Sequence, residues 1–329
     1  MEREEQATKV VAIGGGTGLS TLLRGLKEHT PHTTAIVTVA DDGGSSGRLR
    51  RELGVLPPGD FRNCIAALAD DEALITQLFQ YRFGQGQGLN GHSFGNLFIT
   101  ALAAVTGSFE RALLETGRVL KVQGRILPST LEDVTLVADL RQEVDPLAGA
   151  SKLTRVQGES AIPRSGQPIE RVFLRPDRVR AYPEAVRAIL EAELIVIGPG
   201  SLFTSVLPNL LVQDVCRAVE ASSAPKIYVC NVATQPGETD EFDVGQHVTA
   251  LQRHVGQGVV THVLANNNMV SSKEQPQLRP VRSSYPTGEG YEVIEGDLID
   301  PGAPWRHDSQ KLANQVMQFY SDLVVGDFE

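Results

Sequence analysis

This chain of 329 residues has little cysteine, no excess of positive charge and no long apolar run. Its three cysteines, Cys64, Cys216 and Cys230, are scattered in apolar contexts, which excludes a disulfide framework and a Cys-x-x-Cys metal site. The formal net charge is -10, whereas a general nucleic-acid-binding protein needs a basic face. No apolar run approaches the ~20 residues that span a bilayer, and the acidic start MEREEQATK is unlike a signal peptide. We therefore expect a cytoplasmic protein with no nucleic-acid partner and no membrane insertion.

Short apolar runs alternate with longer helical patterns, which predicts an α/β protein with a parallel sheet flanked by helices. The predicted core strands are Val10–Ile13, Ala35–Ala40, Leu194–Ile197, Ile227–Cys230 and His262–Ala265.

About 150 residues separate the second and third of these strands, too many for one crossover connection. The stretch from 61 to 120 has helical spacing, and the stretch from 123 to 175 contains two strand-like segments, DVTLVADL and IERVFLRP. Between them, GASKLTRVQGESAIPRSGQP is rich in turn formers. We expect one Rossmann-like domain over residues 1–329, mostly parallel, with a mixed helical and β insertion at about residues 61–175.

The first predicted strand leads into a glycine-rich turn, IGGGTGLS, and then into a helix. Such a turn aims unpaired backbone N–H groups at an anion. The nearest following lysine, Lys27, is too late for a Walker motif, and Leu19 stands where a dinucleotide fingerprint needs its third glycine. A turn needed only for close helix–strand packing is the alternative. The density of glycine favours phosphate binding, and the candidate residues are Gly14, Gly15, Gly16, Thr17 and Gly18.

The second predicted strand ends in ADDGGSSGRLR. Asp41 and Asp42 could accept hydrogen bonds from a ribose, hold Mg²⁺ or position a substrate hydroxyl. Asp and Gly also build ordinary turns, but two Asp, three Gly and two Ser in succession favour a binding site. Ser45 and Ser46 belong to the same candidate site.

Three further strands also end in small or polar residues. Gly198, Gly200 and Ser201 follow the third strand and form a second candidate anion-facing helix start. Asn231 and Gln235 follow the fourth strand, and NNN follows the fifth. Ligands of open α/β sheets bind at the carboxyl ends of the strands, so these loops predict one composite pocket.

Two motifs in the predicted insertion contribute further candidates. In LPPGDFRNC, Asp60 is expected to cap a helix, while Arg62 and Asn63 are candidates to face the ligand. In GHSFGNLF, His92 and Asn96 are candidates, although a lone histidine is more often structural.

Seven blocks occur in one order over nearly the whole chain: GGGTGLS, ADDGGSSGRLR, PPGDFRNC, GHSFGNLF, IGPGSLFTSVLPNLL, NVATQPGET and WRHDSQKLA. Together they resemble the gluconeogenesis factor family (YvcK-type), which is related to 2-phospho-L-lactate transferase in a CofD-like superfamily. The resemblance implies a Rossmann-like fold, a cytoplasmic homodimer and binding of a UDP-sugar, notably UDP-N-acetylglucosamine, without turnover. It also implies regulation of cell-envelope precursor supply and cell shape, with a protein partner in amino-sugar synthesis.

The related transferases imply the alternative function. They join a nucleotide-activated phospholactate to a deazaflavin, and a divalent metal such as Mg²⁺ would then lie at Asp41 and Asp42. A nicotinamide-dependent oxidoreductase is disfavoured by the missing third glycine and by the lack of a recognisable proton relay.

The resemblance also implies roles for individual residues. Gly15, Gly16 and Thr17 would meet the diphosphate, Arg306 would contact the nucleotide sugar, and Ser309 would be a phosphorylation site. A tyrosine that holds the nucleotide in relatives has no clear counterpart in NNNMVSSKEQPQLRPVRSSY, and Tyr285 is an open substitute. In the same C-terminal segment, Asp308 or Ser309 is expected to cap a final amphipathic helix.

Overall fold

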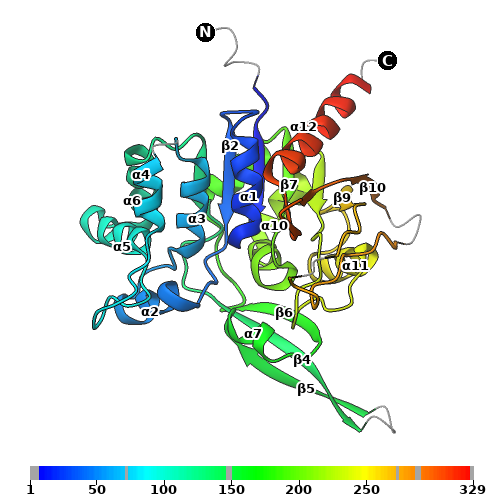
Figure 1. Cartoon of the computed structure of the whole chain (residues 1–329), viewed down its shortest axis with the longest axis horizontal. Helices are drawn as coiled ribbons and strands as arrows, with labels where there is room; N and C mark the ends of the chain where they lie inside the picture. The colour runs from blue at the N-terminus through cyan, green and yellow to red at the C-terminus, as the bar shows by residue number, and fades with distance from the viewer. Residues whose placement is uncertain (1–6, 71–72, 146–149, 272–273, 286–289, 327–329) are drawn as a thin grey trace.

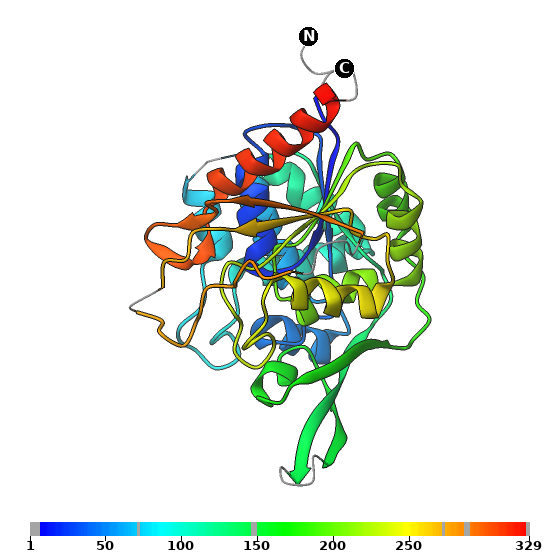
Figure 2. The same ribbon diagram turned by 90° about the vertical axis from the view of Figure 1, so that its right-hand side faces the viewer.

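The computed structural model describes residues 7–70, 73–145, 150–271, 274–285 and 290–326. At its centre lies a parallel sheet of seven strands with helices on both faces (Figures 1 and 2). In spatial order the strands are β10 (Glu292–Gly296), β9 (His262–Asn266), β8 (Lys226–Val229), β7 (Leu194–Ile197), β1 (Val10–Gly14), β2 (Thr33–Val37) and β3 (Arg125–Pro128).

The predicted α/β, Rossmann-like class is confirmed, and so are the five predicted core strands, within a few residues at their ends. Strands β1, β2, β7 and β8 are buried along their whole length, as the apolar runs require of strands covered on both faces. In register, Val10 of β1 lies between Thr33 of β2 and Leu194 of β7. The strand order reverses between β1 and β7, which makes this the switch point where such sheets hold their ligands.

The two edge strands, β3 and β10, were not predicted because they are short and carry polar side chains. Strand β3 lies within the segment that the sequence assigns to the insertion, so a run of helices connects β2 to β3. These helices are α2 (Gly44–Leu53), α3 (Gly59–Leu68), α4 (Ala73–Gln80), α5 (Phe94–Thr106) and α6 (Phe109–Val119).

A separate antiparallel sheet in the order β5-β4-β6 projects from one end of the main sheet (Figures 1 and 2). Its elements are β4 (Thr135–Asp145), β5 (Ala150–Gln157), the short helix α7 (Ala161–Arg164) and β6 (Ile169–Arg175). The two strands predicted here are confirmed. Between them, where the sequence is rich in turn formers, β5 forms a polar strand of eight residues with mostly exposed side chains, which the sequence did not predict.

The remaining elements complete the two helical layers and a small hairpin. They are α1 (Gly16–Leu26), α8 (Pro183–Leu190), the π-helical turn η1 (Leu202–Val206), α9 (Leu207–Leu210), α10 (Gln213–Ala221), α11 (Val244–Val255), β11 (Ile299–Asp300), β12 (Ala303–His307) and α12 (Ser309–Gly326).

Helix α1 packs closely against α12. A Cβ on Gly25 would lie 2.1 Å from the carbonyl oxygen of Ser309, so only glycine permits this approach. The expected cap of α12 is Asp308, whose Oδ1 accepts hydrogen bonds from the backbone N–H groups of Gln310 and Lys311, both at 2.9 Å. All three cysteines are free. Within the described ranges, no helix combines the length and the apolarity needed to cross a membrane.

Candidate functional site

The first glycine turn joins the end of β1 to the start of α1. Gly15 is extended, with φ -174° and ψ -177°, and Gly16 has φ +65°, a conformation that favours glycine. The N–H groups of Gly16, Thr17 and Gly18 occupy the first helical turn, where an α-helix offers no acceptors of its own. Thr17 is exposed, so this turn is open to an incoming anion.

The second glycine turn packs directly on the first. A Cβ on Gly18 would lie 2.6 Å from the carbonyl oxygen of Pro199, and a Cβ on Gly200 would lie 3.2 Å from that of Gly15. The side-chain amide of Asn209 donates to the carbonyl oxygens of Gly14 and Ser205, both at 2.9 Å. The two predicted helix starts therefore touch each other at the switch point, and the region around them is called the compartment below.

Asp60 reaches this compartment, a position that sequence reasoning missed. The expected capping role is wrong, since Pro58 takes the N-cap position of α3 and Asp60 lies in the first turn. Its carboxylate accepts from the backbone N–H of Gly16, and a Cβ on Gly15 would lie 2.6 Å from its Oδ2. Burial, reinforced by the charge of Asp41, raises the pKa of Asp60 to about 7. A carboxylate of the protein itself thus lies at the N-terminal end of α1, where an anionic ligand was expected.

Asp41 lies beside Asp60 in a polar network. Its Oδ1 accepts from the backbone N–H of Gly43 at 2.8 Å, and burial raises its pKa. A Cβ on Gly59 would lie 2.4 Å from Ser46 Oγ and 2.8 Å from Asp41 Oδ2, so this glycine allows the two loops to meet. The amide of Asn96 donates to Ser46 Oγ at 3.4 Å.

Asp42 faces the antiparallel insertion. Its Oδ1 accepts from the backbone N–H of Ser160 at 2.9 Å and from the Ser160 hydroxyl at 2.8 Å. The neighbouring Glu159 has its pKa raised to about 8 by burial and then by the charges of Asp41 and Asp60. No local signal in the sequence marked Glu159, because its neighbours in space come from distant segments. The insertion thus adds a carboxylate to the same compartment.

The carboxylate of Glu238 lies at the N-terminal end of η1, just as the carboxylate of Asp60 lies at the N-terminal end of α1. Its Oε1 accepts from Thr204 Oγ1 at 2.9 Å, and the backbone N–H of Phe203 also donates to the carboxylate. Burial raises the pKa of Glu238 to about 7. Gln235, on the same loop, donates to Ser201 Oγ at 2.9 Å.

Several buried polar atoms around these turns have no hydrogen-bond partner within the described part of the chain. Such atoms are rare in folded proteins and call for an explanation, such as a ligand. They are Asn96 Oδ1, Asn231 Oδ1, Gln235 Oε1, Glu238 Oε2 and Arg62 Nε.

The other predicted residues of the insertion pair locally. Ser45 Oγ lies 2.9 Å from His92 Nδ1, and burial lowers the pKa of His92. Arg62 donates to the side chain of Asn63 at 2.8 Å. Burial lowers the pKa of Arg62, and the charges of Asp60 and Asp41 oppose that shift. Arg62 therefore lies within electrostatic range of the carboxylates, whereas Ser45 and His92 bond to each other.

Two predicted segments lie further from the turns. The asparagines at and after the end of β9 serve the local fold: Asn266 Oδ1 accepts from Leu298 N–H at 3.1 Å, and Asn268 donates to Asp297 at 3.1 Å. Arg306 is exposed on β12. Its neighbour His307 donates through Nε2 to the carbonyl oxygen of Cys230 at 3.2 Å, which holds β12 over the end of β8.

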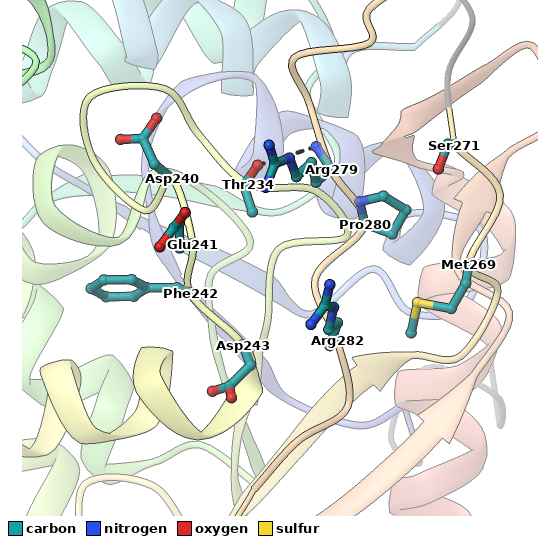
Figure 3. A pocket seen from close by; sticks show the side chains of 10 residues that line it. All are labelled: Thr234, Asp240, Glu241, Phe242, Asp243, Met269, Ser271, Arg279, Pro280 and Arg282. Atoms are coloured by element: carbon teal, nitrogen blue, oxygen red, sulfur yellow. Dashed lines mark hydrogen bonds between the residues drawn. The ribbon is translucent and has the colours of Figure 1, made fainter.

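A cavity of about 580 Å³ lies where β8 and β9 end (Figure 3). Its size falls within the range of ligand pockets, about 300–1,000 Å³. Asp240 and Asp243 line one side, and Arg279 and Arg282 line the facing side. Thr234 Oγ1 accepts from the backbone N–H of Arg279 at 3.2 Å, and Thr234 directly precedes Gln235. The cavity therefore adjoins the second glycine turn.

The sheet order and the paired turns define a Rossmann-like α/β protein with its candidate site at the switch point. The profile of the family described as 2-phospho-L-lactate transferase CofD matches residues 10–299. The chain belongs to this family, in which its relatives include gluconeogenesis factors. The gluconeogenesis factor of Bacillus subtilis is 44% identical over 325 residues, covering 96% of this chain and 99% of that protein. The gluconeogenesis factor of Listeria monocytogenes is 45% identical, covering 96% of each chain.

Solved structures agree with this placement. A crystal structure of a Bacillus halodurans protein superposes with a TM-score of 0.87 at 42% identity, covering 95% of this chain and all of that one. A second crystal structure, described as a member of the UPF0052 family from the same organism, gives a TM-score of 0.86 at 42% identity and covers 95% of this chain and 99% of that one.

Proposed function

We propose that this protein binds a UDP-sugar, UDP-N-acetylglucosamine above all, and acts in the cytoplasm as a regulator of cell-envelope precursor supply and cell shape. The observation that carries the proposal is the contact between the two glycine turns at the switch point, with Gly16, Thr17 and Gly18 in the first turn of α1, where backbone N–H groups have no acceptor within the helix. The gluconeogenesis factors among the relatives support a regulatory role.

In this proposal the diphosphate lies on the first turn, where it meets the carboxylate of Asp60. Two negative groups at one helix start repel each other, so a proton or a cation must accompany the ligand. Mg²⁺ is held by one or two carboxylates together with substrate phosphates. Among the described residues no three His, Cys, Asp or Glu side chains are grouped to hold a metal. The pair Asp41 and Asp60 fits Mg²⁺ only together with phosphate oxygens and water.

The nucleoside then occupies the cavity at the ends of β8 and β9. Strands β1 and β8 are two positions apart in the sheet, about 10 Å, a separation that one nucleoside diphosphate spans. Arg279 and Arg282 would donate to the base or the α-phosphate, and Arg306 would close the site from β12. Tyr285 packs against the hydrophobic core, so we assign no base contact to it.

We also propose a homodimer that signals to an enzyme of amino-sugar synthesis and is modulated by phosphorylation of Ser309. This serine is half-buried at the first position of α12. A phosphate there would gain from the helix dipole, as phosphate groups at helix N-termini do.

A transferase reaction is the second candidate, favoured by the carboxylates beside the first turn and by the family profile. In that case Asp41 or Asp60 would help hold Mg²⁺ and position the hydroxyl of a deazaflavin acceptor. Formation of product from a nucleotidyl-lactyl donor and a deazaflavin would establish it.

Calorimetric titration of the purified protein tests the main proposal. The ligands are UDP-N-acetylglucosamine, GDP and NAD, each with and without Mg²⁺. We expect saturable binding of UDP-N-acetylglucosamine and weaker or no binding of NAD. Absence of binding for every UDP-sugar up to millimolar concentration would overturn the proposal.

A further inference from the structure

A second cavity lies between the antiparallel insertion and the C-terminal ends of α9 and α11. Its volume is about 540 Å³, which is also within the range of ligand pockets. Three arginines line it, although the chain as a whole has a net charge of -10. These arginines and the apolar residues beside them are Arg155, Arg171, Arg253, Val172, Phe173 and Leu211.

Asp139 of β4 fixes the orientation of two of the arginines. Its Oδ1 accepts from Arg155 Nε at 2.7 Å, and its Oδ2 accepts from Arg171 Nε at 2.8 Å. Asp139 is buried, whereas the side chains of Arg155 and Arg171 are 45% and 61% exposed. A guanidinium has five N–H donors, so both arginines keep donors beyond those that Asp139 uses.

The ring of Phe173 makes a second contact with the same two arginines. The guanidinium carbon of Arg155 lies 5.0 Å from the ring centre, and that of Arg171 lies 5.7 Å from it. Both distances are within the range of cation–π attraction. Because a carboxylate and an aromatic ring already hold these guanidiniums, they lose little conformational freedom when an anion binds.

The charges around the cavity leave a positive excess. Glu170 also lines it but is paired with Arg141, so that pair is neutral as a whole. Asp139 offsets one of the three arginines, and the C-terminal ends of α9 and α11 together offset at most about one more. His254 adds no charge, because its Nε2 accepts from the backbone N–H of Val172 at 2.9 Å and burial lowers its pKa. About one positive charge therefore remains for a ligand.

This cavity is separate from the one at the ends of β8 and β9, and the two share no lining residue. Helix α11 connects them: Asp243, its N-cap, lines the first cavity, and Arg253 follows ten residues later. At 1.5 Å per residue these positions are about 15 Å apart along the helix. A ligand that lies on the first glycine turn and in the first cavity therefore leaves this one open.

We propose that the cavity beside the insertion is a second ligand site, which binds the phosphate group of a small phosphorylated metabolite. Arg155 and Arg171 donate to the phosphate oxygens, because the fork of a guanidinium matches phosphate geometry, and Arg253 donates from α11. Phe173 and Leu211 contact the carbon skeleton of the ligand. The site goes beyond the proposed function, since it makes the protein respond to a metabolite other than the UDP-sugar.

Calorimetric titration with phenyl phosphate tests the inference. UDP is present at a saturating concentration, so that the glycine turns do not take the phosphate of the probe. Benzoate, which has a carboxylate in place of the phosphate, is the reference ligand. We expect saturable binding of phenyl phosphate to the wild type in the millimolar range, and binding of benzoate at least about tenfold weaker, because the phosphate has more charge and more acceptor oxygens.

Arg253→Gln should weaken binding of phenyl phosphate about tenfold, because a hydrogen bond to a charged group is lost. Arg253→Lys, which keeps the charge without the fork, should lose less. Arg24→Gln is the matched control and should bind as the wild type does. Arg24 is also an exposed arginine in the last turn of a helix, α1, and it does not line this cavity.

Three results would each overturn the inference while the proposed function stands. They are no saturable binding of phenyl phosphate, equal binding of benzoate, and equal affinity of Arg253→Gln and Arg24→Gln for phenyl phosphate. Failure of UDP to bind would instead count against the proposed function. The comparison of Arg253→Gln with Arg24→Gln would still decide the present inference in that case, because Arg253 lies away from the glycine turns.

Discussion

Gly18→Ala is the substitution that probes the contact between the two glycine turns. Gly18 has no unusual φ and lies in the first turn of α1, where alanine would improve helix propensity by about 1 kcal/mol. Its new Cβ would lie 2.6 Å from the carbonyl oxygen and 2.7 Å from the carbonyl carbon of Pro199. Ordinary contact begins at 3.4 Å, so the turns must separate by about 0.8 Å.

Overpacking of this kind costs about 1–3 kcal/mol, and the helix gain offsets part of it. We expect a net loss of stability of about 0–2 kcal/mol by chemical denaturation. Affinity for UDP-N-acetylglucosamine should fall about 10- to 100-fold by calorimetry, because a hydrogen bond to a charged group contributes about 1.5–3 kcal/mol. Gly84→Ala is the control, since its Cβ would meet nothing within 4 Å. A folded Gly18→Ala protein with unchanged affinity would refute the shared compartment.

Three further substitutions test other parts of the structure. The folded state raises the pKa of Glu238 to about 7, so its contribution to stability falls as pH rises from the ordinary pKa of a glutamate through 7. Glu238→Gln should lose this contribution, while Asp60 and Glu159, whose pKa values are also raised, keep theirs. Between about pH 5 and about pH 8, the free energy of unfolding should fall by about 1–3 kcal/mol more in the wild type than in Glu238→Gln, and an equal fall in both proteins would contradict the assignment. Asp139 is buried and pairs with both Arg155 and Arg171. Asp139→Asn should therefore lower the free energy of unfolding, measured in urea, by about 1–2 kcal/mol. An unchanged free energy of unfolding would show that these ion pairs do not stabilise the fold. Arg306→Ala should weaken UDP-sugar binding by about 1.5–3 kcal/mol without moving the melting temperature, and unchanged affinity would remove Arg306 from the site.

The sequence predicted those strands whose burial on both faces forces a continuous apolar run. Strands β1, β2, β7, β8 and β9 are of this kind. Strands β3, β5 and β10 have at least one exposed face, so their polar residues hide the pattern.

The glycine turns were predictable because an anion-facing helix start has a local signature. The carboxylates that meet at those turns were not. Asp60 follows Pro57, Pro58 and Gly59, where a cap is the local expectation, yet its partner Gly16 lies 44 positions earlier in the chain. Glu159 and Glu238 likewise gain their environment only when distant loops pack together. Local propensity carries no information about such contacts.

The measurement that tests the account most directly is a crystal structure of the protein with UDP-N-acetylglucosamine and Mg²⁺. The account predicts phosphate oxygens within hydrogen-bond distance of the backbone N–H groups of Gly16 to Gly18, and the uracil in the cavity lined by Arg279 and Arg282. The account would be contradicted by a ligand bound elsewhere, for example in the groove between α6 and β3. In that outcome the first glycine turn would contact only the carboxylate of Asp60 and no phosphate.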